Sequence, residues 1–279
     1  MNIQFSKMHG LGNDFVVIDA IAQPINLSSE QIRFLADRHF GIGCDQLLLV
    51  EKTALANVDF RYRIFNSNGG EVEQCGNGAR CFARFIRDKG LTDKKVIRVE
   101  TQSGIIELHI DDNENVTVDM GVANFIPESL PMKTDALKVL NSGKYSLELN
   151  NHMIEFGAVS MGNPHAVLLV DNVDNAEVET LGSVLEAHAI FPQRVNVGFM
   201  QVVDRQNLRL RVYERGVGET KACGTGACAA VVVAQQWDLV GKNVQVQLPG
   251  GTLTIQRTEN GNVLLIGDAV LVFDGQIKL

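Results

Sequence analysis

Short apolar runs alternate with stretches of helical periodicity along the chain. Residues 15–19 (FVVID), 45–51 (DQLLLVE) and 60–66 (FRYRIFN) are rich in β-branched and aromatic residues and are predicted to be strands. Residues 28–40 (SSEQIRFLADRHF) begin with a capping signature, a serine followed three residues later by a glutamine, and continue as an amphipathic helix. This mixture of strands and helices predicts a fold of the α/β (α+β) class.

Two further segments predict helices that lie close to the core. Residues 78–90 (GARCFARFIRDKG) form a helical pattern that ends at Gly90, a residue suited to the backbone conformation that closes a helix. Residues 226–241 (GACAAVVVAQQWDLVG) are apolar on nearly all faces, which predicts a buried helix. A turn with a cysteine and glycines precedes each helix. We therefore expect two curved sheets, each wrapped around a central helix with a cysteine at its N-terminal end.

The two halves of the chain repeat one another. Cys75-Gly-Asn-Gly-Ala returns as Cys223-Gly-Thr-Gly-Ala. The same order of polar residues precedes both cysteines: Asn13, Gln46 and Asn66 before the first, and Asn163, Asn196 and Glu214 before the second. Because several weak matches occur in one order at nearly constant spacing, we interpret the chain as two homologous, pseudo-symmetric halves. The predicted boundaries are residues 1–121 for the half with Cys75 and residues 122–269 for the half with Cys223.

Composition limits the classes of function. The chain has 279 residues and a net charge of −8, which argues against a nucleic-acid-binding protein. It contains five cysteines but no C-x-x-C pair, no H-E-x-x-H motif and no phosphate-binding loop, so we expect no metal and no nucleotide cofactor. Neither a signal peptide nor an apolar run of membrane-spanning length is found. We expect a cytoplasmic protein that does not bind a membrane.

The two cysteine turns carry the predicted chemistry. A helix N-terminus has unpaired N–H groups and a partial positive charge, so it can bind a carboxylate, and it lowers the pKa of a cysteine. Two such ends that face one another can hold one carboxylate between two thiols. A thiolate then removes an α-proton from one side, and a thiol returns a proton from the other. The repeat therefore predicts an active site in the cleft between the halves that inverts a stereocentre.

The motifs, in their order along the chain, resemble those of the diaminopimelate epimerases over essentially the whole sequence. They are MHGLGNDFVVID (8–19), CGNGARC (75–81), GNPHAV (162–167), RVYERGVGET (211–220) and ACGTGA (222–227). The resemblance implies interconversion of LL- and meso-2,6-diaminoheptanedioate (diaminopimelate) by a two-base mechanism without pyridoxal phosphate or another cofactor. This reaction serves lysine biosynthesis and the supply of a peptidoglycan precursor. The resemblance also implies a homodimer, and a C-terminal segment, residues 270–279, that returns to the first half.

The same resemblance assigns roles to individual residues. It implies that Cys75 and Cys223 are the acid/base pair, with His165 and Glu214 as auxiliary groups. The helix-end residues that hold the reacting carboxylate are Gly76, Asn77, Gly224 and Thr225. The substrate-binding residues are Asn13, Gln46, Asn66, Asn163, Asn196, Glu214 and Arg215. Side-chain amides suit a zwitterion because they both donate and accept. Arg215 suits the distal carboxylate, and Glu214 suits a substrate ammonium.

Other interpretations remain open. A proline or hydroxyproline racemase would use the same cysteine pair but needs no site for a distal carboxylate. An isomerase of the phenazine-pathway type has carboxylates where this chain has cysteines. A binding module or thiol redox sensor would use the two cysteines as a disulfide-forming pair. Taken singly, His165 fits a core histidine, Arg215 a surface ion pair and the glycines plain turns. Cys81 and Cys228 fit core thiols, and Cys44 has no predicted role.

Overall fold

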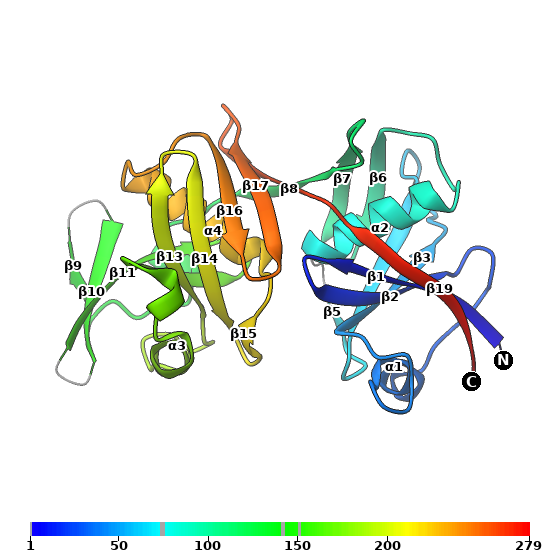
Figure 1. The fold of residues 1–279 in the computed structure, drawn as a ribbon, viewed down its shortest axis with the longest axis horizontal. Coiled ribbons are helices and arrows are strands. Elements are labelled where there is room, and N and C mark those ends of the chain that lie inside the picture. The colour runs from blue at the N-terminus through cyan, green and yellow to red at the C-terminus, as the bar shows by residue number, and fades with distance from the viewer. Residues whose placement is uncertain (1, 73–75, 141–142, 150–151) are drawn as a thin grey trace. The chain divides into compact units, whose positions relative to one another are not determined.

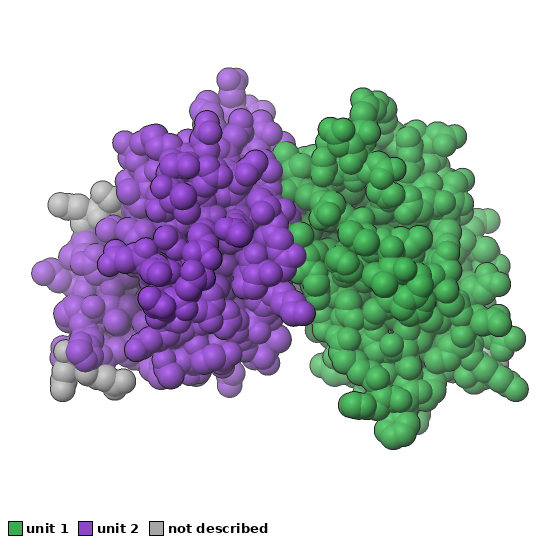
Figure 2. Space-filling view, in the orientation of Figure 1, with its two compact units in different colours: residues 1–119, 266–279 green, residues 120–265 purple. Residues whose placement is uncertain are grey.

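The computed structural model of the chain describes residues 2–72, 76–140, 143–149 and 152–279. It divides into two compact units (Figure 2), unit 1 formed by Met1–Asp119 with Ile266–Leu279 and unit 2 formed by Met120–Leu265. The sequence prediction places the corresponding joins at residues 121 and 270. None of the helices among the described residues has the length and apolar character needed to cross a membrane.

Unit 1 is a curved sheet with one helix inside the curve (Figure 1). Its strands are β1 (Asn2–Gly10), β2 (Asn13–Asp19), β3 (Gln46–Glu51), β4 (Phe60–Asn66), β5 (Glu71–Val72), β6 (Val96–Thr101), β7 (Gly104–Ile110), β8 (Val116–Val122) and β19 (Val270–Lys278), and its helices are α1 (Ser29–Ala36) and α2 (Gly76–Asp88). The strand order is β19–β1–β2–β3–β4–β6–β7–β8. Pairs β2–β3 and β4–β6 are parallel and the others are antiparallel. Because α2 contacts β1, β2, β3, β7 and β19, the sheet wraps around it.

Unit 2 repeats this arrangement. Its elements are β9 (Lys138–Val139), β10 (Lys144–Leu149), β11 (His152–Ser160), β12 (Pro164–Leu169), β13 (Asn196–Asp204), β14 (Asn207–Glu214), β15 (Gly218–Thr220), β16 (Asn243–Leu248), β17 (Gly251–Arg257), β18 (Asn262–Gly267), α3 (Val178–Glu186), α4 (Gly224–Gln236) and the short 3-10 helices η1 (Pro127–Ser129) and η3 (Val173–Asn175). Here the parallel pairs are β12–β13 and β14–β16, and α4 contacts β11 to β14, β16 and β17. The predicted α/β fold of two pseudo-symmetric halves is confirmed.

The strand registers align the repeated polar positions in the same way in both units. In unit 1, Gln46 of β3 pairs with Phe15 on one side and with Asn66 on the other. In unit 2, Asn196 of β13 pairs with His165 of β12. Residues that were aligned only by sequence order therefore occupy equivalent places at the ends of equivalent strands. Along the chain, β4 is followed by β5 and α2, and β14 is followed by β15 and α4.

Helix α1 has the predicted start and a different end. The Ser28 hydroxyl accepts the Gln31 N–H at 3.2 Å, and the Gln31 side chain accepts the Ser28 N–H at 2.9 Å, which confirms the capping box. The predicted helix extends to Phe40, but α1 ends at Ala36. The reason is Asp37, whose backbone is extended and whose carboxylate accepts the Phe40 N–H at 2.8 Å. The end predicted for this helix is therefore wrong by one turn.

The two central helices are buried as predicted. Helix α4 is buried from Gly226 to Ala234 without a break, which its uniformly apolar sequence requires. Helix α2 is closed by Gly90, which has a φ of +65° and is followed by a Leu91 N–H that bonds back to the Ile86 carbonyl at 2.9 Å. The core thiols predicted at positions 81 and 228 are both fully buried within these helices.

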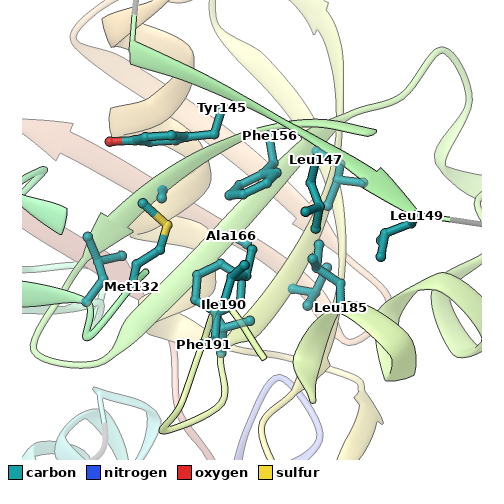
Figure 3. Packing of buried hydrophobic residues seen from close by; sticks show 14 of the residues in the cluster. Met132, Tyr145, Leu147, Leu149, Phe156, Ala166, Leu185, Ile190 and Phe191 are labelled. Atoms are coloured by element: carbon teal, nitrogen blue, oxygen red, sulfur yellow. The ribbon is translucent and has the colours of Figure 1, made fainter. Parts of the chain in front are cut away.

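A second hydrophobic layer packs on the other face of the unit 2 sheet (Figure 3). Phe156 lies between Tyr145 and Phe191, with ring centroids 5.8 and 6.0 Å away. Ala166 of β12 belongs to the same cluster. Since successive residues of a strand point to opposite faces, His165 points to the face that α4 covers. The sheet is thus held between this cluster and α4.

Candidate functional site

The N-terminus of α4 carries a buried thiol beside a carboxylate. Cys223 is the N-cap of α4, with extended backbone angles (φ −121°, ψ 106°), and its side chain is buried. Its Sγ donates to Oε2 of Glu214 at 3.2 Å, and Oγ1 of Thr225 lies 3.6 Å from Sγ. Glu214 is brought here by the end of β14, and Thr225 by the first turn of α4. These contacts bring the three predicted site residues together at the start of α4.

A line of hydrogen bonds leads from this thiol to a buried histidine. Nδ2 of Asn163 donates to Oγ1 of Thr225 at 3.3 Å, and Oδ1 of Asn163 lies 3.0 Å from Nε2 of His165. In the tautomer with its proton on Nε2, His165 donates to this amide oxygen. The turn before β12 and the start of α4 thus bring His165, Asn163, Thr225 and Cys223 into one network.

Asn196 and Arg215 lie in the same unit and contact one another. Nδ2 of Asn196 donates to the Pro164 carbonyl at 3.2 Å, and its Oδ1 accepts the backbone N–H of Arg215 at 2.9 Å. The exposed guanidinium of Arg215 donates to the carbonyl of Gln193 at 3.1 Å. Among the described residues, no carboxylate lies within ion-pair distance of this guanidinium. Its charge is therefore accessible to an anionic ligand.

Burial sets the protonation of the two titrating groups near α4. Burial and the neighbouring Glu214 carboxylate raise the pKa of the Cys223 thiol well above its ordinary value. The expectation that the helix N-terminus lowers this pKa is wrong for Cys223, because desolvation of the thiolate outweighs the field of the helix. Burial, and then the charge of Arg215, lower the pKa of His165 to about 3. At neutral pH the site therefore holds a thiol and a neutral imidazole.

The N-terminus of α2 in unit 1 carries side-chain amides. Helix α2 begins at Gly76, and Nδ2 of Asn77 in its first turn donates to Oδ1 of Asn13 at 3.1 Å. A second amide pair lies on neighbouring strands, where Nε2 of Gln46 donates to Oδ1 of Asn66 at 2.8 Å. The four predicted binding residues of this half that carry side-chain amides are thus brought together in two pairs. Their donors and acceptors match the needs of a zwitterionic ligand.

Only one of the two predicted catalytic cysteines lies among the residues that the structure describes. Cys75 belongs to residues 73–75 and lies outside the described residues. Cys223 is described and has the contacts given above. The described residues contain no group of three or more histidine, cysteine, aspartate or glutamate side chains arranged to hold a metal ion.

The chain matches a known family along most of its length. The sequence model of diaminopimelate epimerase matches residues 5–126 and 157–272. A diaminopimelate epimerase of Nitrosospira multiformis is 55% identical over 280 residues, covering 100% of this chain and 99% of that protein. One of Thioalkalivibrio sulfidiphilus is 57% identical over 282 residues, covering 100% of both. The chain belongs to the diaminopimelate epimerase family. It is accordingly an enzyme of the isomerase class.

Solved structures with distant sequences share the fold of the diaminopimelate epimerase family. A phenazine biosynthesis protein of the PhzF family from Bacillus anthracis matches with a TM-score of 0.71 at 17% identity, covering 100% of both chains. A hydroxyproline epimerase from Agrobacterium vitis, with bound trans-4-hydroxy-L-proline, matches with a TM-score of 0.68 at 17% identity, covering 100% of this chain and 93% of that one. At this identity the matches show the fold alone. The racemase and phenazine alternatives therefore share the architecture, whereas the sequence places the chain with the diaminopimelate epimerases.

Three residues of the site in this member of the diaminopimelate epimerase family were missed by sequence reasoning. Oγ1 of Thr220 donates to Oε1 of Glu214 at 2.5 Å, which orients the carboxylate beside Cys223. Asp45 accepts from Asn13, and the fully buried Arg80 donates to Asn77. Only Arg80 left a signal in the sequence, as a charged residue inside a segment whose neighbours predict burial.

The neutral, buried His165 predicts a specific pH dependence of stability. The unfolded chain binds a proton at this residue near its ordinary pKa of 6.5, whereas the folded chain binds it only near 3. Between these values the unfolded state holds more protons, so the free energy of unfolding falls as pH falls. Between pH 7 and pH 5 we expect a loss of about 2 kcal/mol that His165→Asn does not show.

Urea unfolding of both proteins at pH 7 and pH 5 measures this difference. The other histidines are common to both proteins and cancel in the comparison. An equal loss of stability in the parent and the variant would show that His165 is not held neutral by the fold.

Proposed function

We propose that the protein interconverts LL- and meso-diaminopimelate by moving protons between the substrate α-carbon and two thiols, Cys75 and Cys223, without a cofactor. The observation that carries this proposal is Cys223 itself, a buried thiol at the N-cap of α4 with a carboxylate and a hydroxyl as hydrogen-bonding neighbours. A thiol in this position can donate a proton to a ligand whose carboxylate is bound by the N–H groups of the helix.

The helix ends supply the electrostatic part of the reaction. In the proposed complex the reacting carboxylate accepts hydrogen bonds at the starts of the two helices, from the turns with Gly76 and Asn77 and with Gly224 and Thr225. When the α-proton leaves, its electron pair delocalises into this carboxylate. The additional negative charge then develops next to the N–H groups and the positive helix ends, which stabilise it more than they stabilise the substrate. The barrier to carbanion formation is lowered in this way.

The environment of Cys223 suits the role of the acid when the other cysteine is the base. Its raised pKa keeps the proton on sulfur until a stronger base, the carbanion-like α-carbon, takes it. The thiolate that remains can accept hydrogen bonds from the Thr225 hydroxyl and the Gly226 N–H, both of which favour the ionised sulfur. In the reverse direction the same thiolate removes the proton. Cys75 is proposed to act in the same two ways on the opposite face of the carbon.

The remaining contacts favour diaminopimelate as the substrate. Arg215 has an accessible guanidinium that can bind the distal carboxylate in bidentate fashion. Asn196 accepts the backbone N–H of Arg215, and Asn163 bonds to Thr225 beside Cys223. The amide pairs of unit 1 offer further donors and acceptors. A cyclic imino acid has no second carboxylate for Arg215 to bind, so proline is a weaker candidate.

The substrate assignment is tested by chiral chromatography after incubation of the purified, reduced protein with LL-diaminopimelate or L-proline and no added cofactor. We expect the meso isomer to form from diaminopimelate and no D-proline to form from proline. Racemisation of proline without reaction of diaminopimelate would overturn the assignment of the substrate but not the proposed thiol chemistry.

We propose that the protein is a homodimer in the cytoplasm, where thiols remain reduced. The sequence of β19 supports a partner surface, since it exposes Val270, Leu271, Val272 and Phe273 in succession on unit 1. Each of these side chains is 36–54% exposed, so β19 offers apolar surface that a partner could cover. The net charge of −8 gives no support to a nucleic-acid partner.

A further inference from the structure

Four side chains of unit 1 form a line of hydrogen bonds that runs from a cation to an anion. NH2 of Arg80 donates to Oδ1 of Asn77 at 3.0 Å, and Nδ2 of Asn77 donates to Oδ1 of Asn13 at 3.1 Å. Nδ2 of Asn13 then donates to Oδ2 of Asp45 at 3.0 Å. The line links α2, the start of β2 and the residue just before β3. Its two middle members are predicted substrate-binding residues.

The charged ends determine which way each amide points. A guanidinium only donates hydrogen bonds, so the atom of Asn77 that faces Arg80 is its oxygen. A carboxylate only accepts, so the atom of Asn13 that faces Asp45 is its nitrogen. Rotation of either amide by half a turn would place a donor against a donor or an acceptor against an acceptor. Each amide is therefore held in one of its two orientations.

Both ends of the line are anchored by the surrounding fold. Arg80 is fully buried, and its Nε donates to the carbonyl of Asp268 at 3.0 Å, in the segment just before β19. Gly10 packs closely against it, since a Cβ at this position would lie 3.0 Å from NH2 of Arg80. Asp45 is bound by Arg38, whose NH2 lies 2.7 Å from Oδ1. The ends are thus fixed before any ligand binds.

Unit 2 shows that a central helix of this kind packs without a guanidinium. Thr225 of α4 corresponds to Asn77 of α2, and the residue three positions later is Cys228 rather than an arginine. Cys228 is fully buried in the core. A buried charge costs free energy through desolvation, and an apolar residue of similar size is often the more stable choice. The presence of Arg80 in unit 1 therefore calls for a reason other than packing.

We propose that Arg80 and Asp45 are positioning residues for substrate binding, which hold the amides of Asn13 and Asn77 in the one orientation that matches the substrate. This inference rests on the proposed function, because it takes both amides as ligands of the substrate. An amide in the wrong orientation would offer a donor where the substrate needs an acceptor. The binding step would then lose a hydrogen bond and leave a polar group unpaired.

Steady-state kinetics of matched variants test this proposal. We expect Arg80→Met to lower kcat/KM for diaminopimelate by about 10- to 100-fold, mainly through KM. Arg84→Met serves as the control, because Arg84 lies one turn further along α2 and pairs with Asp88 at the surface. We expect the control to keep the parent values. Equal kinetics of the two arginine variants would overturn the proposal.

A second pair of variants covers the case in which Arg80→Met does not fold. Asp45 is partly exposed, with a side-chain exposure of 46%, so changes there disturb the core little. Asp45→Asn keeps an oxygen that can accept from Asn13, whereas Asp45→Leu does not. We expect kcat/KM to fall by about 10-fold in the leucine variant and by less than about threefold in the asparagine variant. An equal effect of both would contradict a role in orientation.

Side-chain amide signals in ¹⁵N NMR test the orientation of the two amides independently of the proposed function. In the free protein we expect separate, well-dispersed amide protons for Asn13 and Asn77, and loss of that dispersion in Arg80→Met but not in Arg84→Met. If the parent does not epimerise diaminopimelate but shows this difference, the proposed function fails and the orientation of the amides stands. Unchanged dispersion in Arg80→Met refutes the orientation whatever the activity.

Discussion

Replacing Cys223 by alanine is expected to lower the rate of conversion of LL- to meso-diaminopimelate by about 1,000-fold or more, because alanine can neither give nor take a proton. Glu214 is not expected to replace the thiol, since its carboxylate is held by Thr220 at 2.5 Å and already accepts a hydrogen bond from the sulfur in the parent. The same loss is expected for Cys75→Ala on the opposite face of the substrate. Initial rates with each purified variant, measured by chiral chromatography, check both expectations.

Cys228→Ala is the matched control for Cys223→Ala. Both changes remove a buried sulfur from the region of α4, but Cys228 lies inside the helix and has no predicted role in proton transfer. The Cys228→Ala variant therefore measures how a small cavity beside the helix affects turnover. We expect its activity to lie within about threefold of the parent. Near-parent turnover by Cys223→Ala, or the same loss in both variants, would contradict the assignment of Cys223 as an acid/base group.

The second large effect is expected at Arg215. Arg215→Met should lower kcat/KM for diaminopimelate by about 100-fold, because a charge-assisted bidentate hydrogen bond to the distal carboxylate is lost. Lysine is diaminopimelate without that carboxylate. The parent protein should therefore exchange the α-proton of lysine slowly, and Arg215→Met should exchange it at the same slow rate. The discrimination between the two amino acids should therefore disappear in the variant.

Arg209→Met controls for the loss of a positive charge on β14, the strand that ends just before Arg215. Arg209 lies on β14 and pairs with Asp174 at 2.8 Å, away from the predicted binding residues. We expect its kinetics to match those of the parent. If Arg215→Met retains the full preference for diaminopimelate over lysine, Arg215 does not bind the distal carboxylate.

Local sequence patterns were sufficient to predict the elements that surround the site. The strands at 15–19, 45–51 and 60–66 and the buried helix α4 follow from residue types that act within one element. The repeat also aligned Gln46 with Asn196, and the registers place both at the starts of equivalent strands. Such features depend on short-range periodicity and on residue order, which one sequence contains in full.

Contacts across the fold could not be predicted in this way. The bonds of Thr220 to Glu214 and of Asp45 to Asn13 depend on how separate segments are placed. The bond of Arg80 to Asn77, three residues apart on α2, depends on the direction of both side chains. The early end of α1 depends on Asp37, whose carboxylate accepts the backbone N–H groups of His39 and Phe40. The direction of the pKa shift at Cys223 depends on burial, which outweighs the local effect of the helix end. Apart from the end of α1, which one local side chain decides, these are properties of the folded surroundings rather than of a segment.

The most direct test of two-base chemistry follows deuterium during the first part of the reaction. LL-diaminopimelate is incubated with the reduced protein in D₂O without cofactor, and both isomers are separated and analysed by NMR at low conversion. If one thiolate removes the proton and the opposite thiol supplies another, the new meso isomer carries deuterium at the inverted carbon while the remaining LL isomer keeps its protium. Deuterium that enters the remaining LL isomer as fast as the product would show that a single group serves both faces, and would contradict the roles assigned to Cys75 and Cys223.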